Sequence, residues 1–333
     1  MRATVVGAGV AGLASALELL ERGATVEVIE RGPQLGASTC SFAAGGMLAP
    51  WCEGESAEPA VTRLGVAALD WWARHFAGTM RRGTLVVAPP RDASELLRFA
   101  ERTTRHRWLG EPEISELEPD LGGRFRRALF FAEEAHLDPR AALRALAEGL
   151  AERGAAIRFG LDGRESGGDA DVVLDCRGFA ARDRLPELRG VRGEMMLLRT
   201  REISLSRPVR LLHPRVPIYV VPRGEGLFMV GATMIESDHR GPVTARSAAE
   251  LINGAYALHP AFGEAEIVEI CADIRPAFPD NLPRVIRQGR TIYVNGLFRH
   301  GFLLSPAVAR EAAETAFSTL EVGHDHHPQR RSA

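Results

Sequence analysis

The sequence contains no lysine, so all 41 of its Lys-plus-Arg residues are arginine. A pyridoxal-phosphate enzyme needs a lysine for its Schiff base, and a Walker-type phosphate loop needs a lysine beside the phosphates, so both classes are excluded. The formal net charge is only −2. This balance leaves no broad basic surface for nucleic acid or for an anionic membrane, and we expect neither partner.

Cysteines and long apolar runs are also scarce. The four cysteines form no CxxC pair, and nothing else in the sequence is typical of a secreted disulfide scaffold. The N-terminus shows no charged segment followed by an apolar signal region. The apolar run 211–221 is broken by His213, Pro214, Arg215 and Pro217, so it does not reach membrane-spanning length. We therefore expect a cytoplasmic protein.

The first thirty residues predict a dinucleotide-binding turn. Residues 3–6 are a β-branched run typical of a buried strand, and residues 13–22 are helix formers followed by Gly23. Between them, Gly7 permits a tight turn, Gly9 a close approach to a pyrophosphate, and Gly12 close packing of helix on strand. A second strand, 25–29, leads to Glu30. This acid stands at the position where dinucleotide-binding folds hold the ribose hydroxyls of the cofactor.

The rest of the chain shows two patterns of predicted secondary structure. Strands predicted at 84–88, 128–131, 156–159 and 171–175 are interspersed with helices at 93–103, 115–118 and 138–152. From residue 195 onward, strand-like runs at 195–199, 218–221, 227–230 and 265–271 are interrupted by one helix, 245–258, which predicts a largely antiparallel sheet. The C-terminus predicts a strand at 291–294, a helix at 306–320 and a disordered tail from Gly323, whose histidines we do not expect to form a physiological metal site.

The residues after Glu30 bear on which dinucleotide binds. Arg31 would suit the 2′-phosphate of NADP. The run 38–47 is instead made of small and hydroxyl-bearing residues, which let backbone and hydroxyl groups approach a second phosphate and the edge of an isoalloxazine ring. On composition alone this run also fits any tight loop, so the residues by themselves leave both cofactors open.

Several further segments occur together in one family. Through them the chain resembles, essentially from end to end, the glycine oxidases of thiamine biosynthesis, which belong to the D-amino acid oxidase and sarcosine oxidase superfamily of FAD-dependent oxidoreductases. The matching segments are the glycine turn 5–13, AAGGMLAP at 43–50, HLDP at 136–139, RGE at 192–194, YVVPR at 219–223, VGATM at 230–234, IRP at 274–276 and FRHGFLL at 298–304.

The resemblance implies an α/β fold with a Rossmann-type FAD-binding domain and an interleaved substrate domain on a mostly antiparallel sheet. The FAD-binding domain would comprise residues 1–75, 136–190 and 288–322. The substrate-binding domain would comprise 76–135 and 191–287. Residues 323–333 would form a disordered tail outside both domains. The isoalloxazine ring would lie where the two domains meet.

The resemblance also assigns cofactor contacts. Residues 299–303 would place backbone N–H groups and a helix N-terminus against the ring, where they would stabilise its reduced form. The turn at Gly178 fits less well, because Cys176 and Arg177 stand where the family usually has an alanine-type residue. No cysteine lies between Arg275 and Asn281, so we predict non-covalent FAD. The cofactor set is Gly7, Ala8, Gly9, Val10, Ala11, Gly12, Glu30, Arg31, Ser41, Ala44, Gly45, Gly46, Met47, Gly178, Phe179, Arg299, His300, Gly301, Phe302 and Leu303.

On the substrate side, the resemblance makes Arg275 the anchor for a carboxylate, since a guanidinium can form two parallel charge-assisted hydrogen bonds. Tyr219 would add a hydroxyl contact, and Met47 and Met234 would crowd the substrate side chain and favour glycine-sized substrates. Without the resemblance these would be a surface arginine, a packed strand tyrosine and core methionines. Some relatives promote O2 reduction with a lysine, so here we expect Arg299 or His300 to supply the charge.

These expectations amount to FAD-dependent oxidative deamination of glycine, or of a similar small amino acid, with O2 reduced to hydrogen peroxide. The imine product would hydrolyse to glyoxylate or be used for thiazole assembly. Alternatives are sarcosine, D-alanine or a modified peptide amine as substrate, and a quinone as electron acceptor. An NAD(P)-dependent dehydrogenase and a flavin-binding protein without turnover are the other classes. A homo-oligomer is left open, because the sequence shows no interface signature.

Overall fold

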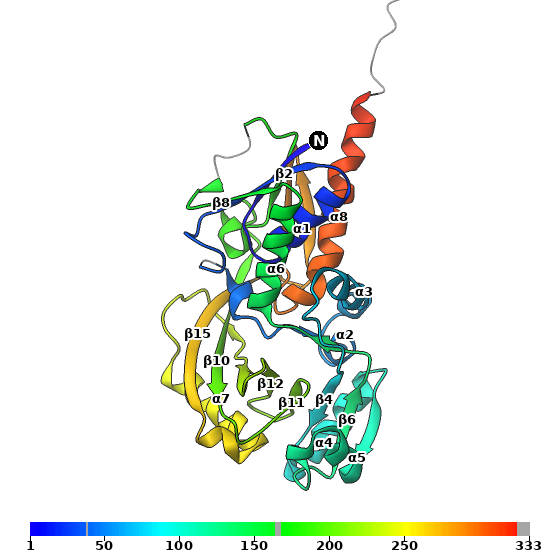
Figure 1. Ribbon diagram of the computed structural model, residues 1–333, viewed down its shortest axis with the longest axis vertical. Coiled ribbons are helices and arrows are strands. Elements are labelled where there is room, and N and C mark those ends of the chain that lie inside the picture. Colours follow the sequence, from blue (N-terminus) through cyan, green and yellow to red (C-terminus); the bar gives the residue numbers. More distant parts are fainter. Residues whose placement is uncertain (38, 164–167, 325–333) are drawn as a thin grey trace, which may run out of the picture.

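The computed structural model describes residues 1–37, 39–163 and 168–324, and two large sheets organise it along its longest axis (Figure 1). The six-stranded sheet lies in the upper part of Figure 1, and it is parallel except for the pair β16–β17. Its order is β16 (Arg284–Gln288), β17 (Thr291–Asn295), β9 (Val172–Asp175), β1 (Arg2–Val6), β2 (Thr25–Glu30) and β8 (Ala156–Phe159).

Helices pack on this sheet because their apolar residues fall on the faces that meet it. In α1 (Val10–Glu21), Leu13 and Leu17 are buried among residues of β1 and of the C-terminal helix α8 (Gly301–His324). The same core takes residues from α3 (Pro59–His75) and from α6 (Pro139–Glu152), which begins at the side-chain cap of Asp138. The sheet and its helices therefore form one core around the N-terminal strand.

The nine-stranded sheet is antiparallel apart from the parallel pair β11–β4. Residues of α7 (Ala245–Leu258) pack with it in a second core that includes Phe228 and Phe262. Two further helices lie near its other end, α4 (Ala93–Arg102) and α5 (Glu111–Leu117) (Figure 1). Its path is β14 (Ile235–Glu236), β10 (Arg189–Arg199), β13 (Leu227–Gly231), β12 (Ile218–Pro222), β11 (Val209–Leu211), β4 (Thr84–Val87), β6 (Arg127–Phe131) and β5 (Arg107–Gly110), with β15 (Glu266–Ala277) paired to β10.

Short elements join the two sheets. The 3-10 helix η1 (Cys40–Ala43) leads into β3 (Met47–Leu48), which pairs with β7 (Ala135–His136), and into the one-turn helix α2 (Pro50–Glu53). The chain crosses between the sheets several times, so segments far apart in sequence meet at this junction. The predicted fold class, with an α/β sheet followed by a mostly antiparallel one, is confirmed.

Two helices differ from the expectation. The last helix begins at Gly301 rather than at residue 306, so Pro306 lies inside it. A proline donates no backbone N–H, so the carbonyl of Phe302 loses its helical partner, and Trp72 Nε1 donates to that carbonyl instead at 2.7 Å. That tryptophan belongs to α3, a helix the sequence analysis did not predict.

The C-terminal tail and the possibility of a membrane-spanning helix were also considered in the sequence analysis. Residues 323 and 324 belong to α8, and the remainder of the predicted disordered tail lies outside the described residues. Among the residues that the structure describes, no helix is long and apolar enough to cross a bilayer.

Candidate functional site

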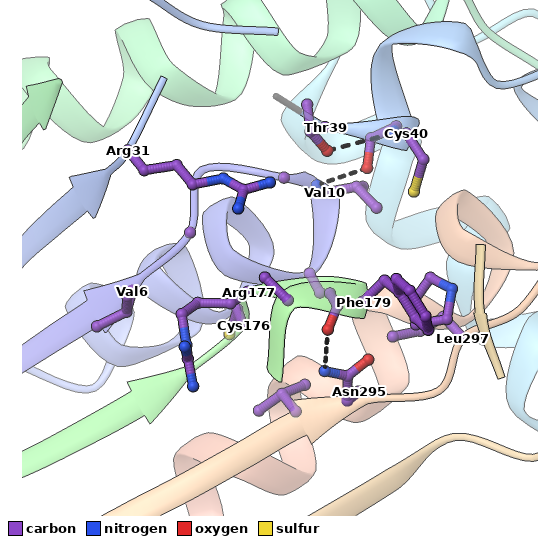
Figure 2. A pocket seen from close by; sticks show the side chains of 18 of the residues that line it. Val6, Val10, Arg31, Thr39, Cys40, Cys176, Arg177, Phe179, Asn295 and Leu297 are labelled. Carbon is purple, nitrogen blue, oxygen red and sulfur yellow. Dashed lines mark hydrogen bonds between the residues drawn. The ribbon is translucent and has the colours of Figure 1, made fainter. Parts of the chain in front are cut away.

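The carboxyl ends of three neighbouring parallel strands, β1, β9 and β17, come together at one edge of the six-stranded sheet. In open α/β sheets this edge is where ligands bind. A cavity of about 340 Å³ opens there, lined by residues that follow each of these strands (Figure 2). The position of the cavity is therefore a consequence of strand order.

The glycines of the first turn are required by close contacts. Gly7 has φ +105°, and a Cβ on it would lie 2.6 Å from the carbonyl oxygen of Cys176. A Cβ on Gly12 would lie 1.8 Å from the carbonyl oxygen of Gly7, and one on Gly9 2.8 Å from Thr39 Oγ1. These glycines leave bare backbone at the N-terminus of α1, where N–H groups and the helix dipole favour phosphate.

Two polar side chains hold this turn in place. The buried carboxylate of Glu30 accepts the N–H of Ala8 with Oε2 and the N–H of Gly32 with Oε1, both at 2.8 Å. The hydroxyl of Ser41 accepts the N–H of Val10 at 3.1 Å (Figure 2). Both side chains also line the cavity, so they fix the turn and present oxygen atoms to a ligand.

Half of the predicted cofactor residues line this cavity. Ala8 and Gly12 lie behind it and shape the turn without facing the space. Thr39 and Cys40, which belong to the run 38–47 but were not in the predicted cofactor set, also line it. The sequence analysis missed Asn295, whose Nδ2 donates to the carbonyl of Gly178 at 2.9 Å (Figure 2). The predicted residues found in the lining are Gly7, Gly9, Val10, Ala11, Glu30, Arg31, Ser41, Gly178, Phe179 and Gly301.

A second, larger cavity of about 860 Å³ lies at the junction of the two sheets and shares Gly301 with the first. The two cavities thus adjoin at the N-terminus of α8. The second one collects the remaining predicted residues from five separate stretches of chain. They are Ala44, Gly45, Gly46, Met47, Tyr219, Met234, Arg275, Arg299, His300, Phe302 and Leu303.

Arg275 lines this cavity and has no carboxylate partner among the residues that the structure describes. Its Nη1 donates to the carbonyl of Thr233 at 3.0 Å, and no ion pair forms between it and any acid in the described part of the chain. The guanidinium lies over Gly193, where a Cβ would come within 2.1 Å of its carbon. Burial lowers the pKa of Arg275, and an arginine still remains charged at neutral pH. The site therefore presents a positive charge that an anionic ligand would neutralise.

Tyr219 stands beside Arg275 at the same cavity. Its ring fills the space next to two glycines: a Cβ on Gly45 would lie 2.7 Å from the ring, and one on Gly231 2.9 Å. Burial raises the pKa of the Tyr219 hydroxyl, so it is a neutral hydrogen-bond donor. Met47 lines the cavity from the loop, whereas Met234 lies at its more open side with 58% of its surface exposed.

Arg299 and His300 share one carboxylate that the sequence analysis did not single out. Glu53, at the end of α2, lies 2.8 Å from Arg299 Nη2 and 2.8 Å from His300 Nε2 through Oε2, and its Oε1 lies 3.1 Å from Arg210 Nη1. Burial acts to raise the pKa of Glu53, but the two arginines and the hydrogen bond with His300 outweigh it and hold that pKa well below its usual value. No local pattern could have revealed Glu53, because its partners lie far away in the sequence.

The two adjoining cavities fit an extended dinucleotide. The first offers the glycine turn and helix N-terminus that suit a pyrophosphate, and the second offers space beside loop 44–47 for a ring system and a small acid. Groups of His, Cys, Asp or Glu that could hold a metal ion are absent from the described residues.

Comparison with known proteins agrees with this geometry. Residues 2–315 match the family model described as FAD dependent oxidoreductase. A protein of Rhizobium etli named as the thiamine biosynthesis oxidoreductase ThiO is 59% identical over the whole of both chains, and a glycine oxidase of Bacillus licheniformis is 27% identical over 93% of this chain and 91% of its own. Among solved structures, a glycine oxidase from Bacillus cereus superposes with a TM-score of 0.79 at 23% identity, covering 94% of this chain and 96% of that one.

Proposed function

Because this chain belongs to the family of FAD-dependent oxidoreductases, we propose that it oxidises glycine, or an amino acid of similar size, with O2 as the electron acceptor. The balanced reaction converts glycine, O2 and water to glyoxylate, ammonia and hydrogen peroxide. The name of the Rhizobium relative supports a role in thiamine biosynthesis. We propose that this role is the assembly of the thiazole, where the imine itself would be the useful product. All four cysteines are free, which supports assignment to a reducing compartment, the cytoplasm.

The observation that carries this proposal is the unpaired charge of Arg275. A guanidinium held by one carbonyl bond keeps donors for a bidentate carboxylate contact, which orients an amino acid by its acid end. The Tyr219 hydroxyl, neutral and next to the same guanidinium, can donate a further hydrogen bond. Together they would fix the position of the α carbon relative to loop 44–47.

FAD, when bound, supplies the two-electron oxidation of the amine. The protein's share is orientation and electrostatics. The carboxylates that line this cavity are engaged by arginines: Glu53 with Arg299 and Arg210, Glu55 with Arg102, Glu95 with Arg98, and Glu250 with Arg246. With its acids so occupied, the cavity suits a substrate that binds with its amine already neutral.

The pairing of Arg299 with Glu53 bears on how O2 is reduced. We expected Arg299 or His300 to supply the charge that assists this step. Because Glu53 compensates the charge of Arg299, we now propose that the uncompensated Arg275 contributes more once the carboxylate product has left.

The decisive test is an anaerobic titration with glycine, sarcosine and D-alanine in turn, following the visible absorbance of the flavin. We expect glycine to bleach it, Arg275→Met to need at least about 100-fold more glycine, and Arg153→Met, at the exposed C-cap of α6, to behave as wild type. A colourless protein, or a coloured one bleached by none of the three, would overturn the proposal. Preference for sarcosine or D-alanine would keep the chemistry and correct the substrate.

A further inference from the structure

Arg223, just beyond β12, reaches from the nine-stranded sheet to the loop of the other domain. Its Nη2 donates to the carbonyl of Gly45 at 2.7 Å and to that of Ala44 at 3.4 Å, and its Nη1 donates to the carbonyl of Leu137 at 2.9 Å. These partners are all backbone carbonyls, and no acid of the described chain forms an ion pair with this guanidinium. Burial lowers its pKa to about 10, so it stays charged at neutral pH.

These bonds determine where two N–H groups of the loop point. In a trans peptide the N–H points opposite to the C=O of the same unit. The carbonyls of Ala44 and Gly45 point at Arg223, so the N–H groups of Gly45 and Gly46 point away from it. Both glycines line the large cavity, and Arg223 does not, so these N–H groups are directed to the cavity side.

Neither N–H has an acceptor among the described residues. Gly46 is buried, and a buried backbone N–H without a partner is rare in a folded protein. Its backbone has φ +69°, and a Cβ there would lie 2.2 Å from the carbonyl oxygen of Leu137, the oxygen that Arg223 also binds. The loop is thus held in a conformation that presents two successive N–H groups, an arrangement that favours anions.

We infer that Arg223 is a positioning residue for the flavin ring. It holds the Ala44 and Gly45 peptide units by their carbonyls and polarises them, so that the Gly45 and Gly46 N–H groups stabilise negative charge on the edge of the ring that faces the loop. A hydrogen bond to a peptide carbonyl strengthens the N–H of the same unit as a donor, because chains of hydrogen bonds polarise one another. Because reduction adds negative charge to the ring, Arg223 favours the reduced form.

The experiment measures the two-electron midpoint potential of bound FAD by chemical reduction against reference dyes, and the dissociation constant of FAD. It needs no amino acid, so a wrong substrate assignment does not affect it. For Arg223→Met we expect the reduction equilibrium to shift about tenfold toward oxidised flavin, equivalent to about 30 mV lower potential. Arg223→Lys, which keeps the charge but fewer carbonyl contacts, should lie between. The control is Arg124→Met, because Arg124 also binds backbone carbonyls, those of Ala257 and Leu258, but does not line either cavity.

An unchanged potential in Arg223→Met overturns the inference, and so does an equal shift in Arg124→Met. If Arg223→Met fails to retain FAD, Arg223→Lys decides: a lowered potential supports the role, and a wild-type potential with weakened FAD binding rejects it in favour of a purely structural contact.

Discussion

The two cavities of this protein are built in opposite ways. The first is organised by a short stretch of chain: Gly7, Gly9 and Gly12 and the acid at Glu30 all lie within the first βαβ unit. The second is assembled from stretches that are far apart, so that Glu53 meets Arg210 and Arg299 from positions 157 and 246 residues later. The glycine turn of the first cavity is a local motif, although the rest of its lining follows β9 and β17, whereas the charge cluster of the second cavity exists only once distant segments have met.

This difference predicts how each site responds to a substitution. A local motif depends on backbone sterics, so a single added methyl group disrupts it. A nonlocal constellation depends on charges balanced among distant segments, so single changes alter stability and specificity by degrees. The predictions below run from the local site to the outermost contact of the junction.

The largest effect on FAD binding is expected at the glycine turn. In Gly12→Ala the new Cβ would lie 1.8 Å from the carbonyl oxygen of Gly7 and cannot be accommodated without moving the turn. We expect FAD affinity to fall by at least about 100-fold, equivalent to about 3 kcal/mol, and the protein to purify without colour.

Gly149→Ala is the matched control, because Gly149 lies in the interior of α6 and its added Cβ would meet only the flexible end of Arg153. It should bind FAD normally and gain up to about 1 kcal/mol of stability from helix propensity. A Gly12→Ala protein that stays yellow with wild-type affinity would show that the turn is not the pyrophosphate site.

The next effect is expected at Glu53. Glu53→Gln leaves Arg210, Arg299 and His300 without their shared carboxylate, and breaking a buried ion pair from one side costs about 3–5 kcal/mol. Urea unfolding of the holoenzyme should show this loss. Glu55→Gln removes the ion pair with Arg102, which is more exposed to solvent. This change should lower the free energy of unfolding by less than about 1 kcal/mol.

The coupling at Glu53 can also be measured directly. The double variant Glu53→Gln/Arg210→Met should be less destabilised than the sum of the two single variants, because the second change removes one of the stranded charges. Additive costs would mean that the cluster does not act as a unit.

The contrast between the cavities also marks how far sequence reasoning reaches. The strand–turn–helix order of the first thirty residues predicted the glycine turn that lines the first cavity, because each step there follows from neighbouring residues. Arg275 and Tyr219 were found only through the family resemblance, since one arginine among 41 carries no signal of its own. Glu53 and Arg223 were missed, because their importance comes from partners that the chain brings together only in three dimensions.

A pH-dependent effect is expected at Glu134, which supports the same junction. Its Oε1 accepts the N–H of Cys52 in α2 at 2.7 Å, and burial raises the pKa of this carboxyl from 4.5 to about 7. A carboxyl with a raised folded pKa gives stability that is complete below the unfolded pKa and is lost as the pH rises to the folded value. The titration of Glu134 should therefore lower the free energy of unfolding of the wild type by about 3 kcal/mol between pH values of about 4.5 and about 7, in proportion to the rise in the pKa of Glu134.

Glu134→Gln cannot ionise, so its unfolding free energy should fall less over the same range. Unfolding of both proteins in urea, with FAD in excess, at a series of pH values gives the comparison. Parallel curves for the two proteins would show that Glu134 does not titrate in this interval.

The smallest effect is expected where a partly exposed ion pair joins α6 to β15 of the nine-stranded sheet. Arg140 of α6 holds Glu269 of β15 through two bonds of 2.9 and 2.6 Å, and its guanidinium also binds the carbonyl of Phe42 and lies 4.5 Å from the centre of that ring. The pair is partly exposed, so Glu269→Gln should cost only about 0.5–1 kcal/mol. Since Arg140 keeps its contacts with Phe42, the flavin site should be unchanged, and FAD affinity should stay within about twofold of wild type. A large loss of FAD affinity in this variant would instead mean that β15 must be held against α6 for the first cavity to form, and the division between a local and a nonlocal site would fail.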